Sequence, residues 1–104
     1  MEYKNVTAVA KANLYFEGKV ISHTIFTAEG KKITLGVILP GTYHFGTGVG
    51  ERMDITDGEC NVVLDGVVTS TNYSSGQSFE VPGNSGFSIT VTNSPCQYVC
   101  NYLD

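Results

Sequence analysis

The stretch Glu51–Gly66, ERMDITDGECNVVLDG, contains two short β-type segments, each followed by a turn signal. Apolar residues alternate with polar ones in Glu51–Thr56, and Cys60–Leu64 is rich in valine and leucine. Asp-Gly pairs follow at positions 57–58 and 65–66. Because glycine accepts the positive φ that tight turns require, an Asp-Gly pair after such a segment is typical of a β-hairpin. The stretch predicts antiparallel strands.

The same kind of segment recurs on both sides, separated by Gly, Pro and Asn. Phe87–Thr92 alternates apolar and polar residues, the pattern of a half-buried strand. The polar stretch Thr69–Gly76 is expected to be a loop. Short, evenly spaced strands with turn signals throughout predict an all-β domain, either a closed barrel or a jelly roll. The other expected strands are Tyr15–Phe26, Ile33–Leu39, Thr42–Phe45, Ser78–Val81 and Gln97–Leu103.

The length of 104 residues is typical of one domain, with residues 1–12 as an N-terminal arm and residues 13–104 as the folded domain. Ten acidic residues against six basic ones give a net charge of -4, without the cation cluster that nucleic-acid binding needs. No apolar run is long enough to predict a membrane span or a secretion signal. Three cysteines, an odd number, then indicate the reduced thiols of a cytoplasmic protein.

The segment Pro40–Phe45, followed by Glu51 and Gly58, resembles the first motif of the cupin superfamily. The six residues between Glu51 and Gly58 fit the spacing of that motif. In metal-binding cupins, the positions that Tyr43 and Phe45 occupy here would be two histidines. The resemblance therefore implies the fold of this superfamily without its metal ligands.

The second cupin motif lacks its histidine as well. Gly76 and Pro82 resemble its start, but Phe87 stands about where the ligand would fall. Imidazole is the favoured nitrogen donor for zinc, iron, nickel and copper, and the only histidines, His23 and His44, lie on different expected strands. We expect no metal site.

A narrower resemblance covers most of the chain beyond about Leu14. The chain is similar to the small cupin-fold pyrimidine/purine nucleoside phosphorylases, and this implies a single-domain cupin-type β-barrel. It also implies that a nucleoside and inorganic phosphate give a free base and ribose 1-phosphate, with both purine and pyrimidine bases accepted. The resemblance further implies that phosphate is the co-substrate, that the protein forms a homodimer, and that it uses no metal or organic cofactor. The matching segments are Tyr15–Val20, Gly36–Tyr43, Glu51–Gly58, Phe79–Ser85 and Tyr98–Leu103.

Glu51 and Tyr43 are the expected catalytic residues. Glycosidic cleavage passes through an oxocarbenium-like state, and an inward carboxylate can stabilise that positive charge and hold ribose hydroxyls. Tyr43 and Phe45 share a face by alternation and can stack on any base, although Phe45 can equally well fill the interior and Tyr43 is the better candidate. A buried Tyr43 hydroxyl needs a hydrogen-bond partner.

Phosphate requires cations or a nest of backbone N–H groups. Lys19 is the preferred cation because the family pattern includes it, whereas Arg52 is expected to face away from the Glu51 side of its strand. The glycine-rich run Gly46–Gly50 is a second candidate for an anion site. The remaining expected substrate contacts are Phe45, Asn84, Ser85 and Tyr102.

Two other functions remain open at this point. A non-catalytic cupin that binds a small sugar or nucleotide would be stabilised by its ligand without forming product. A metal-dependent cupin enzyme, such as an oxygenase or isomerase, would contain stoichiometric metal.

Overall fold

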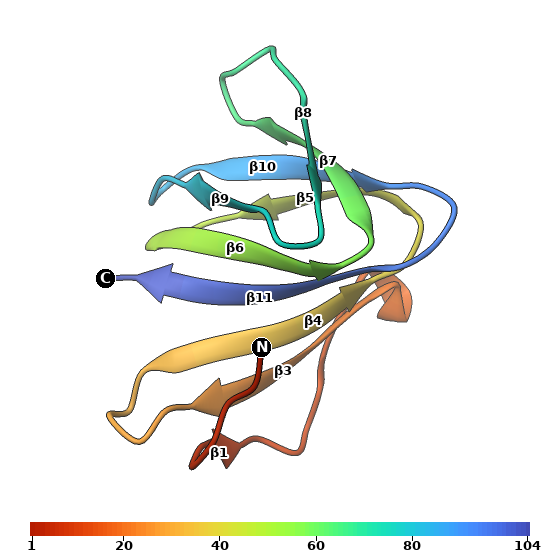
Figure 1. Cartoon of the computed structure of the whole chain (residues 1–104). Helices are drawn as coiled ribbons and strands as arrows, with labels where there is room; N and C mark the ends of the chain where they lie inside the picture. The colour runs from red at the N-terminus through yellow and green to blue at the C-terminus, as the bar shows by residue number, and fades with distance from the viewer.

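A computed structural model describes all residues from Met1 to Asp104 as eleven β-strands and one short 3-10 turn, η1 (Figure 1). The strands before the middle of the chain are β1 Thr7–Ala8, β2 Asn13–Tyr15, β3 Val20–Phe26, β4 Lys32–Ile38 and β5 Gly41–Gly46, with η1 at Phe16–Gly18. The remaining strands are β6 Gly50–Asp57, β7 Glu59–Leu64, β8 Thr71–Ser74, β9 Ser78–Val81, β10 Gly86–Val91 and β11 Cys96–Leu103.

These strands form two antiparallel sheets (Figure 1). The larger has the order β1-β3-β4-β11-β6-β9, with β2 also paired to β3, and the smaller has the order β5-β10-β7-β8. The all-β prediction is confirmed. The hydrogen-bonded ladders remain two separate sheets, however, so the closed barrel that we considered is not formed.

The turn at Asp57–Gly58 passes the chain from one sheet to the other, so the predicted hairpin there is wrong. Strand β6 pairs with β11 and β9, whereas β7 pairs with β10 and β8. Gly58 has φ 77°, and a Cβ there would lie 2.6 Å from the carbonyl oxygen of Pro95. Glycine is therefore required by both conformation and space.

The second Asp-Gly pair does lie between paired strands, because β7 and β8 are antiparallel neighbours. Pairing resumes only at Thr71, opposite Val62, so the connection is a longer loop rather than a two-residue turn. The prediction of a loop over Thr69–Gly76 is wrong for β8. This strand lies at the edge of the smaller sheet, where polar side chains face solvent and only Tyr73 packs against the core.

The expected strand Tyr15–Phe26 is interrupted by η1. Phe16 and Glu17 have φ 53° and 59°, and Gly18 has φ 84°. Such left-handed angles are unfavourable for residues with a Cβ. The Phe16 ring packs against Tyr43 and Phe45, at centroid distances of 5.0 and 5.4 Å, and these contacts hold the turn against the smaller sheet.

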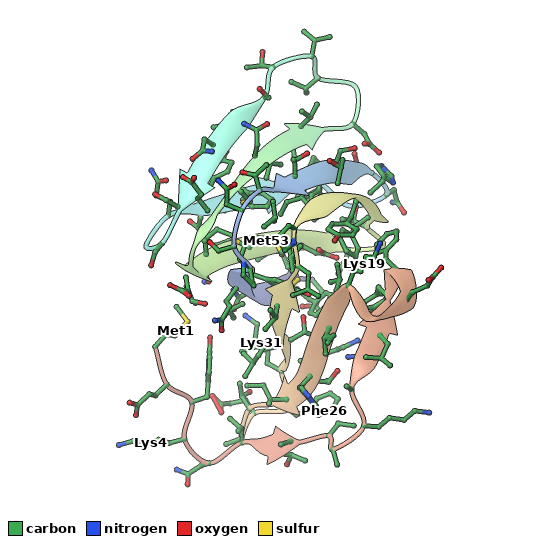
Figure 2. The ribbon with its side chains drawn as sticks, turned by 90° about the vertical axis from the view of Figure 1, so that its right-hand side faces the viewer. Met1, Lys4, Lys19, Phe26, Lys31 and Met53 are labelled. Atoms are coloured by element: carbon green, nitrogen blue, oxygen red, sulfur yellow. The ribbon has the colours of Figure 1, made fainter.

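The main core lies between the two sheets and contains fifteen buried residues. Met53 lies in this interior in Figure 2, whereas Met1 and Lys4 extend from the N-terminal arm outside it. A smaller cluster of Ile25, Ile33 and Val99 lies on the opposite face of the larger sheet. No helix in the structure is both long and apolar enough to cross a membrane.

Candidate active site

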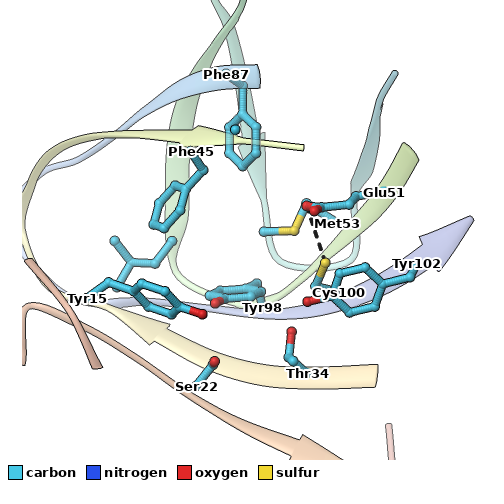
Figure 3. Close-up of a pocket in the computed structure, with 12 residues that line it drawn as sticks. Tyr15, Ser22, Thr34, Phe45, Glu51, Met53, Phe87, Tyr98, Cys100 and Tyr102 are labelled. Atoms are coloured by element: carbon cyan, nitrogen blue, oxygen red, sulfur yellow. Dashed lines mark hydrogen bonds between the residues drawn. The ribbon is translucent and has the colours of Figure 1, made fainter. Parts of the chain in front are cut away.

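A cavity of about 210 Å³ lies between the two sheets (Figure 3). Aromatic rings form one side of it and polar groups gather on the other, with the Tyr98 ring between them. Its twelve lining residues are Tyr15, Ser22, Thr34, Ile38, Phe45, Gly46, Glu51, Met53, Phe87, Tyr98, Cys100 and Tyr102.

The floor of the cavity is built across three neighbouring strands. Ser22 of β3 lies opposite Gly36 of β4, and Gly36 lies opposite Tyr98 of β11. Because Gly36 has no side chain, the Tyr98 ring lies over it, in space that a Cβ would occupy. The Tyr98 hydroxyl interacts with the Ser22 side chain, and burial raises the pKa of this phenol.

Glu51 lies on the polar side, at the start of β6 and directly opposite Tyr102 of β11. The Cys100 thiol donates to Glu51 Oε1 at 3.5 Å, the contact drawn in Figure 3. Thr34 pairs with Cys100 across β4 and β11, so a hydroxyl lines the cavity beside this pair. Carboxylate, thiol, phenol and hydroxyl thus share one half of the cavity.

Burial determines the protonation of these groups. Burial raises the pKa of Glu51, although the Cys100 hydrogen bond and the Lys32 charge oppose the shift. Burial, together with the nearby Glu51 charge, raises the pKa of Cys100 to about 12. Burial also raises the pKa of Tyr102 to about 12. At neutral pH the thiol and the phenol are therefore neutral hydrogen-bond donors, and Cys100 is a poor nucleophile.

The opposite half of the cavity is aromatic. Phe45 stacks on Phe87 with a centroid distance of 5.8 Å and an interplanar angle of 29°. Tyr15 meets the edge of Phe45 at 6.0 Å, and its position follows from the η1 turn that comes next in the chain. These rings offer apolar contact to a planar ligand without fixing which hydrogen bonds it must make.

Three of the seven predicted site residues, Glu51, Phe45 and Tyr102, are brought together at this cavity. Tyr43 faces the interior but does not line it. It is 5% exposed, and its hydroxyl donates to the carbonyl oxygens of Leu39 and Pro40 at 2.8 and 3.1 Å. The hydroxyl partners that we expected are thus backbone groups, and no contact tests the catalytic role of Tyr43.

Lys19, Asn84 and Ser85 do not line the cavity. Lys19 follows η1 and is exposed (Figure 2). The Asn84 N–H donates to the Gly48 carbonyl, and the Ser85 N–H donates to the Thr47 hydroxyl. These two hydrogen bonds tie the glycine-rich loop to the loop before β10.

The structure brings no three His, Cys, Asp or Glu side chains together in a metal-binding arrangement. Tyr43 and Phe45, at the positions where the motif resemblance would have two histidines, both face the interior. His44 faces outward and lies 2.9 Å from Asp65, while His23 is exposed on the larger sheet.

Most residues of the polar wall, and part of the aromatic one, were not predicted from the sequence. Tyr98, Cys100 and Tyr102 alternate along β11, so period-two parity could have placed Tyr98 and Cys100 beside the predicted Tyr102. Ser22 and Thr34 carry no comparable signal, because threonine and serine are common in strands that have no site. Tyr15 depends on the unpredicted turn.

Fold and cavity together define a two-sheet β protein whose inner cavity is aromatic on one side and carries the Glu51 carboxyl on the other. The family model for pyrimidine/purine nucleoside phosphorylase matches residues 10–102, and the chain belongs to this family. A pyrimidine/purine nucleoside phosphorylase of Dechloromonas aromatica is 48% identical over 97% of each chain. One of Herminiimonas arsenicoxydans is 43% identical over 98% of this chain and 97% of the other.

A solved structure from Acinetobacter sp. ADP1, described as a protein of unknown function, is 44% identical. The two structures superpose over 98% of each chain with a TM-score of 0.95.

Proposed function

We propose that this protein is a pentosyltransferase that cleaves purine and pyrimidine nucleosides with inorganic phosphate, giving a free base and ribose 1-phosphate. Membership of the family supports this reaction class. The observation that carries the residue assignment is the position of Glu51, half-buried in the cavity and opposite the aromatic rings. A nucleoside has the same two halves, an aromatic base and a polar sugar.

In this proposal the base contacts Tyr15, Phe45 and Phe87. Stacking on aromatic side chains contributes about 1–3 kcal/mol per base and tolerates different bases, because every base has a π-face. No charged side chain lies among these rings to select one base edge. Broad acceptance of purines and pyrimidines follows from that wall.

The sugar then lies beside Glu51. Its ionised carboxylate stabilises positive charge that develops on the ribose as the glycosidic bond breaks. The Cys100 thiol donates to Glu51 Oε1 and so fixes the carboxylate in the cavity. Tyr102, directly opposite Glu51 in the ladder, offers a neutral hydroxyl to the sugar or to phosphate. We assign no chemical step to Tyr43, whose hydroxyl is engaged by the backbone.

The cavity is smaller than the roughly 300–1,000 Å³ typical of small-molecule sites. We infer that it encloses the sugar and the inner edge of the base, and that the outer edge of the base contacts the exposed rings at the end of β2 and the start of η1. Tyr15 and Phe16 are each 45% exposed and are available for that contact.

We extend the proposal to a cupin-type fold, to function as a homodimer in the cytoplasm, and to catalysis without a metal or organic cofactor. Aromatic residues stand where metal-binding cupins have histidines, so we expect turnover to persist in the presence of a chelator. The three free, buried cysteines suit a reducing compartment.

The purified protein given uridine or adenosine with phosphate is expected to release free base, measured by chromatography. Glu51→Gln keeps the size of the side chain and an acceptor for Cys100, and we expect it to lower kcat by about 100-fold, as for the loss of one transition-state contact. Unchanged turnover in this variant would remove Glu51 from the mechanism. Stabilisation by nucleosides without base release from the unmodified protein would indicate a binding protein instead.

A further inference from the structure

Lys32 lies at the polar end of the cavity. It is the first residue of β4, and strand alternation puts its side chain on the same side as Thr34, which lines the cavity. Its Nζ lies 5.0 Å from the centroid of the Tyr102 ring, another lining residue. A cationic group therefore stands at the cavity edge, beyond Tyr102 and away from the aromatic wall.

This charge has no ionic partner. The two ion pairs of the chain join His44 to Asp65 and Arg52 to Asp54, and Lys32 is in neither. The Lys32 charge lowers the pKa of Glu51, but burial has the larger effect and keeps that pKa above its ordinary value. The ammonium group is close enough to act on the catalytic carboxyl while remaining free to bind an anion.

The other cations lie elsewhere. Arg52 points to the outer face of the larger sheet, with its Nε 3.4 Å from Asp54. Lys31 belongs to the turn before β4, where its backbone N–H donates to the Thr27 hydroxyl. Lys19 follows η1 outside the cavity lining. Lys4 and Lys11 lie in the exposed N-terminal segment before β2.

We propose that Lys32, rather than Lys19, binds the phosphate co-substrate, in a subsite completed by the hydroxyls of Tyr102 and Thr34. The inference rests on the function proposed above.

The reaction geometry agrees with this position. A phosphate oxygen forms a bond to the anomeric carbon as the carbon–nitrogen bond breaks, and the electron pair leaves with the base nitrogen. The proton that dihydrogen phosphate loses ends on the base. Attack comes from the side opposite the departing base, so a base on the aromatic wall requires phosphate at the opposite end of the cavity, where Tyr102 lies (Figure 3). Lys32 lies beside this Tyr102 ring.

The test is a phosphate titration of base release by the full chain and by Lys32→Met, which keeps most of the side-chain length. We expect the KM for phosphate to rise at least about tenfold, the range for loss of a hydrogen bond to a charged group, and the KM for nucleoside to change less than about twofold. Lys32→Arg is expected to restore phosphate affinity in part. Lys31→Met, which removes the neighbouring charge, is expected to leave both KM values unchanged.

Phosphate binding without nucleoside, measured by calorimetry, separates this inference from the proposed reaction. Loss of binding in Lys32→Met would support the subsite even if the unmodified protein released no base. Phosphate binding that is unchanged in Lys32→Met, or absent from the unmodified protein, would overturn it. A phosphate KM within twofold of the original in an active Lys32→Met would overturn it as well.

Discussion

At the scale of single residues, the Glu51 carboxyl is subject to opposing influences. Burial disfavours its charged form, while the Cys100 thiol and the Lys32 ammonium favour it, and the net result is a raised pKa. The folded protein thus disfavours the ionised form of Glu51. This is the form that would stabilise a positively charged sugar. Such a conflict between stability and function is common at active sites.

The raised pKa predicts how stability depends on pH. The folded protein binds the Glu51 proton more tightly than the unfolded chain, whose carboxyl has its ordinary value of 4.5. The contribution of Glu51 to stability therefore falls as pH rises from about 4.5 through the folded-state pKa. Glu51→Gln lacks this titration. As pH rises across this window, we therefore expect the free energy of unfolding of the variant to increase relative to that of the unmodified protein. Urea unfolding of both proteins at several pH values measures the difference.

A constant difference between the two proteins at all these pH values would show that burial does not perturb Glu51. Glu51→Asp is a suitable comparison, because it keeps a titrating carboxyl and should retain a pH-dependent difference from Glu51→Gln.

How far these residues could be predicted depended on whether a sequence motif marked them. The Glu51–Gly58 spacing, which fits the first cupin motif, led to a carboxyl that does line the cavity. The partners of Tyr43 are carbonyls of Leu39 and Pro40, presented by the corner between β4 and β5. Lys32 gains its position from Tyr102, far away in sequence. Neither the corner geometry that serves Tyr43 nor the strand pairing that places Lys32 beside Tyr102 leaves a signal in one sequence.

At the scale of elements, the cavity depends on one row across β3, β4 and β11. Ser22, Gly36 and Tyr98 are consecutive partners in this row, and the large ring occupies the space that glycine leaves. Side-chain packing between neighbouring strands is the main source of sheet specificity. Here the packing of the Tyr98 ring over Gly36 forms the floor of the cavity.

Gly36→Ala tests this arrangement. The added methyl would overlap the Tyr98 ring, so the ring must move or the strands must separate. Overpacking of this kind typically costs about 1–3 kcal/mol, and we expect a loss of that size in the free energy of unfolding. Base release should fall too, because the floor is displaced. Gly48→Ala is the matched control, since a Cβ there meets no atom within 4 Å, and its stability should change by less than about 0.5 kcal/mol.

A Gly36→Ala variant as stable and active as the original protein would mean that Tyr98 can leave the floor without consequence.

Prediction at the level of elements succeeded where the signal was local and failed where partner strands decided the outcome. The alternation in Phe87–Thr92 identified β10 because burial on one face repeats every second residue. The Asp57–Gly58 turn has the chemistry of a hairpin, but the strands that it joins belong to different sheets. β8 is polar since only Tyr73 packs inward from that edge. Strand pairing, unlike strand formation, was not encoded in these short segments.

At the scale of the whole molecule, both faces of the larger sheet carry packed side chains. Its inner face carries the cavity, with Tyr98, Cys100 and Tyr102 on β11. On its outer face, Tyr3 and Val6 of the N-terminal segment pack against Ile25, Ile33 and Val99. The strand β1 adds a short ladder to β3 and fixes that segment in place. The two faces share β11 but have separate side chains, so the segment should affect stability more than catalysis.

Removal of residues 1–6 is therefore expected to lower the free energy of unfolding by about 1–3 kcal/mol, because the apolar area that Tyr3 and Val6 cover returns to water. The double variant Tyr3→Ala, Val6→Ala should reproduce most of this loss, and Lys4→Ala, at an exposed position, should not. The kcat of base release, measured well below the melting temperature, should stay within about twofold, a change under 0.5 kcal/mol in the barrier. A large drop in kcat with unchanged stability would instead mean that the segment acts on the cavity through the shared strand β11.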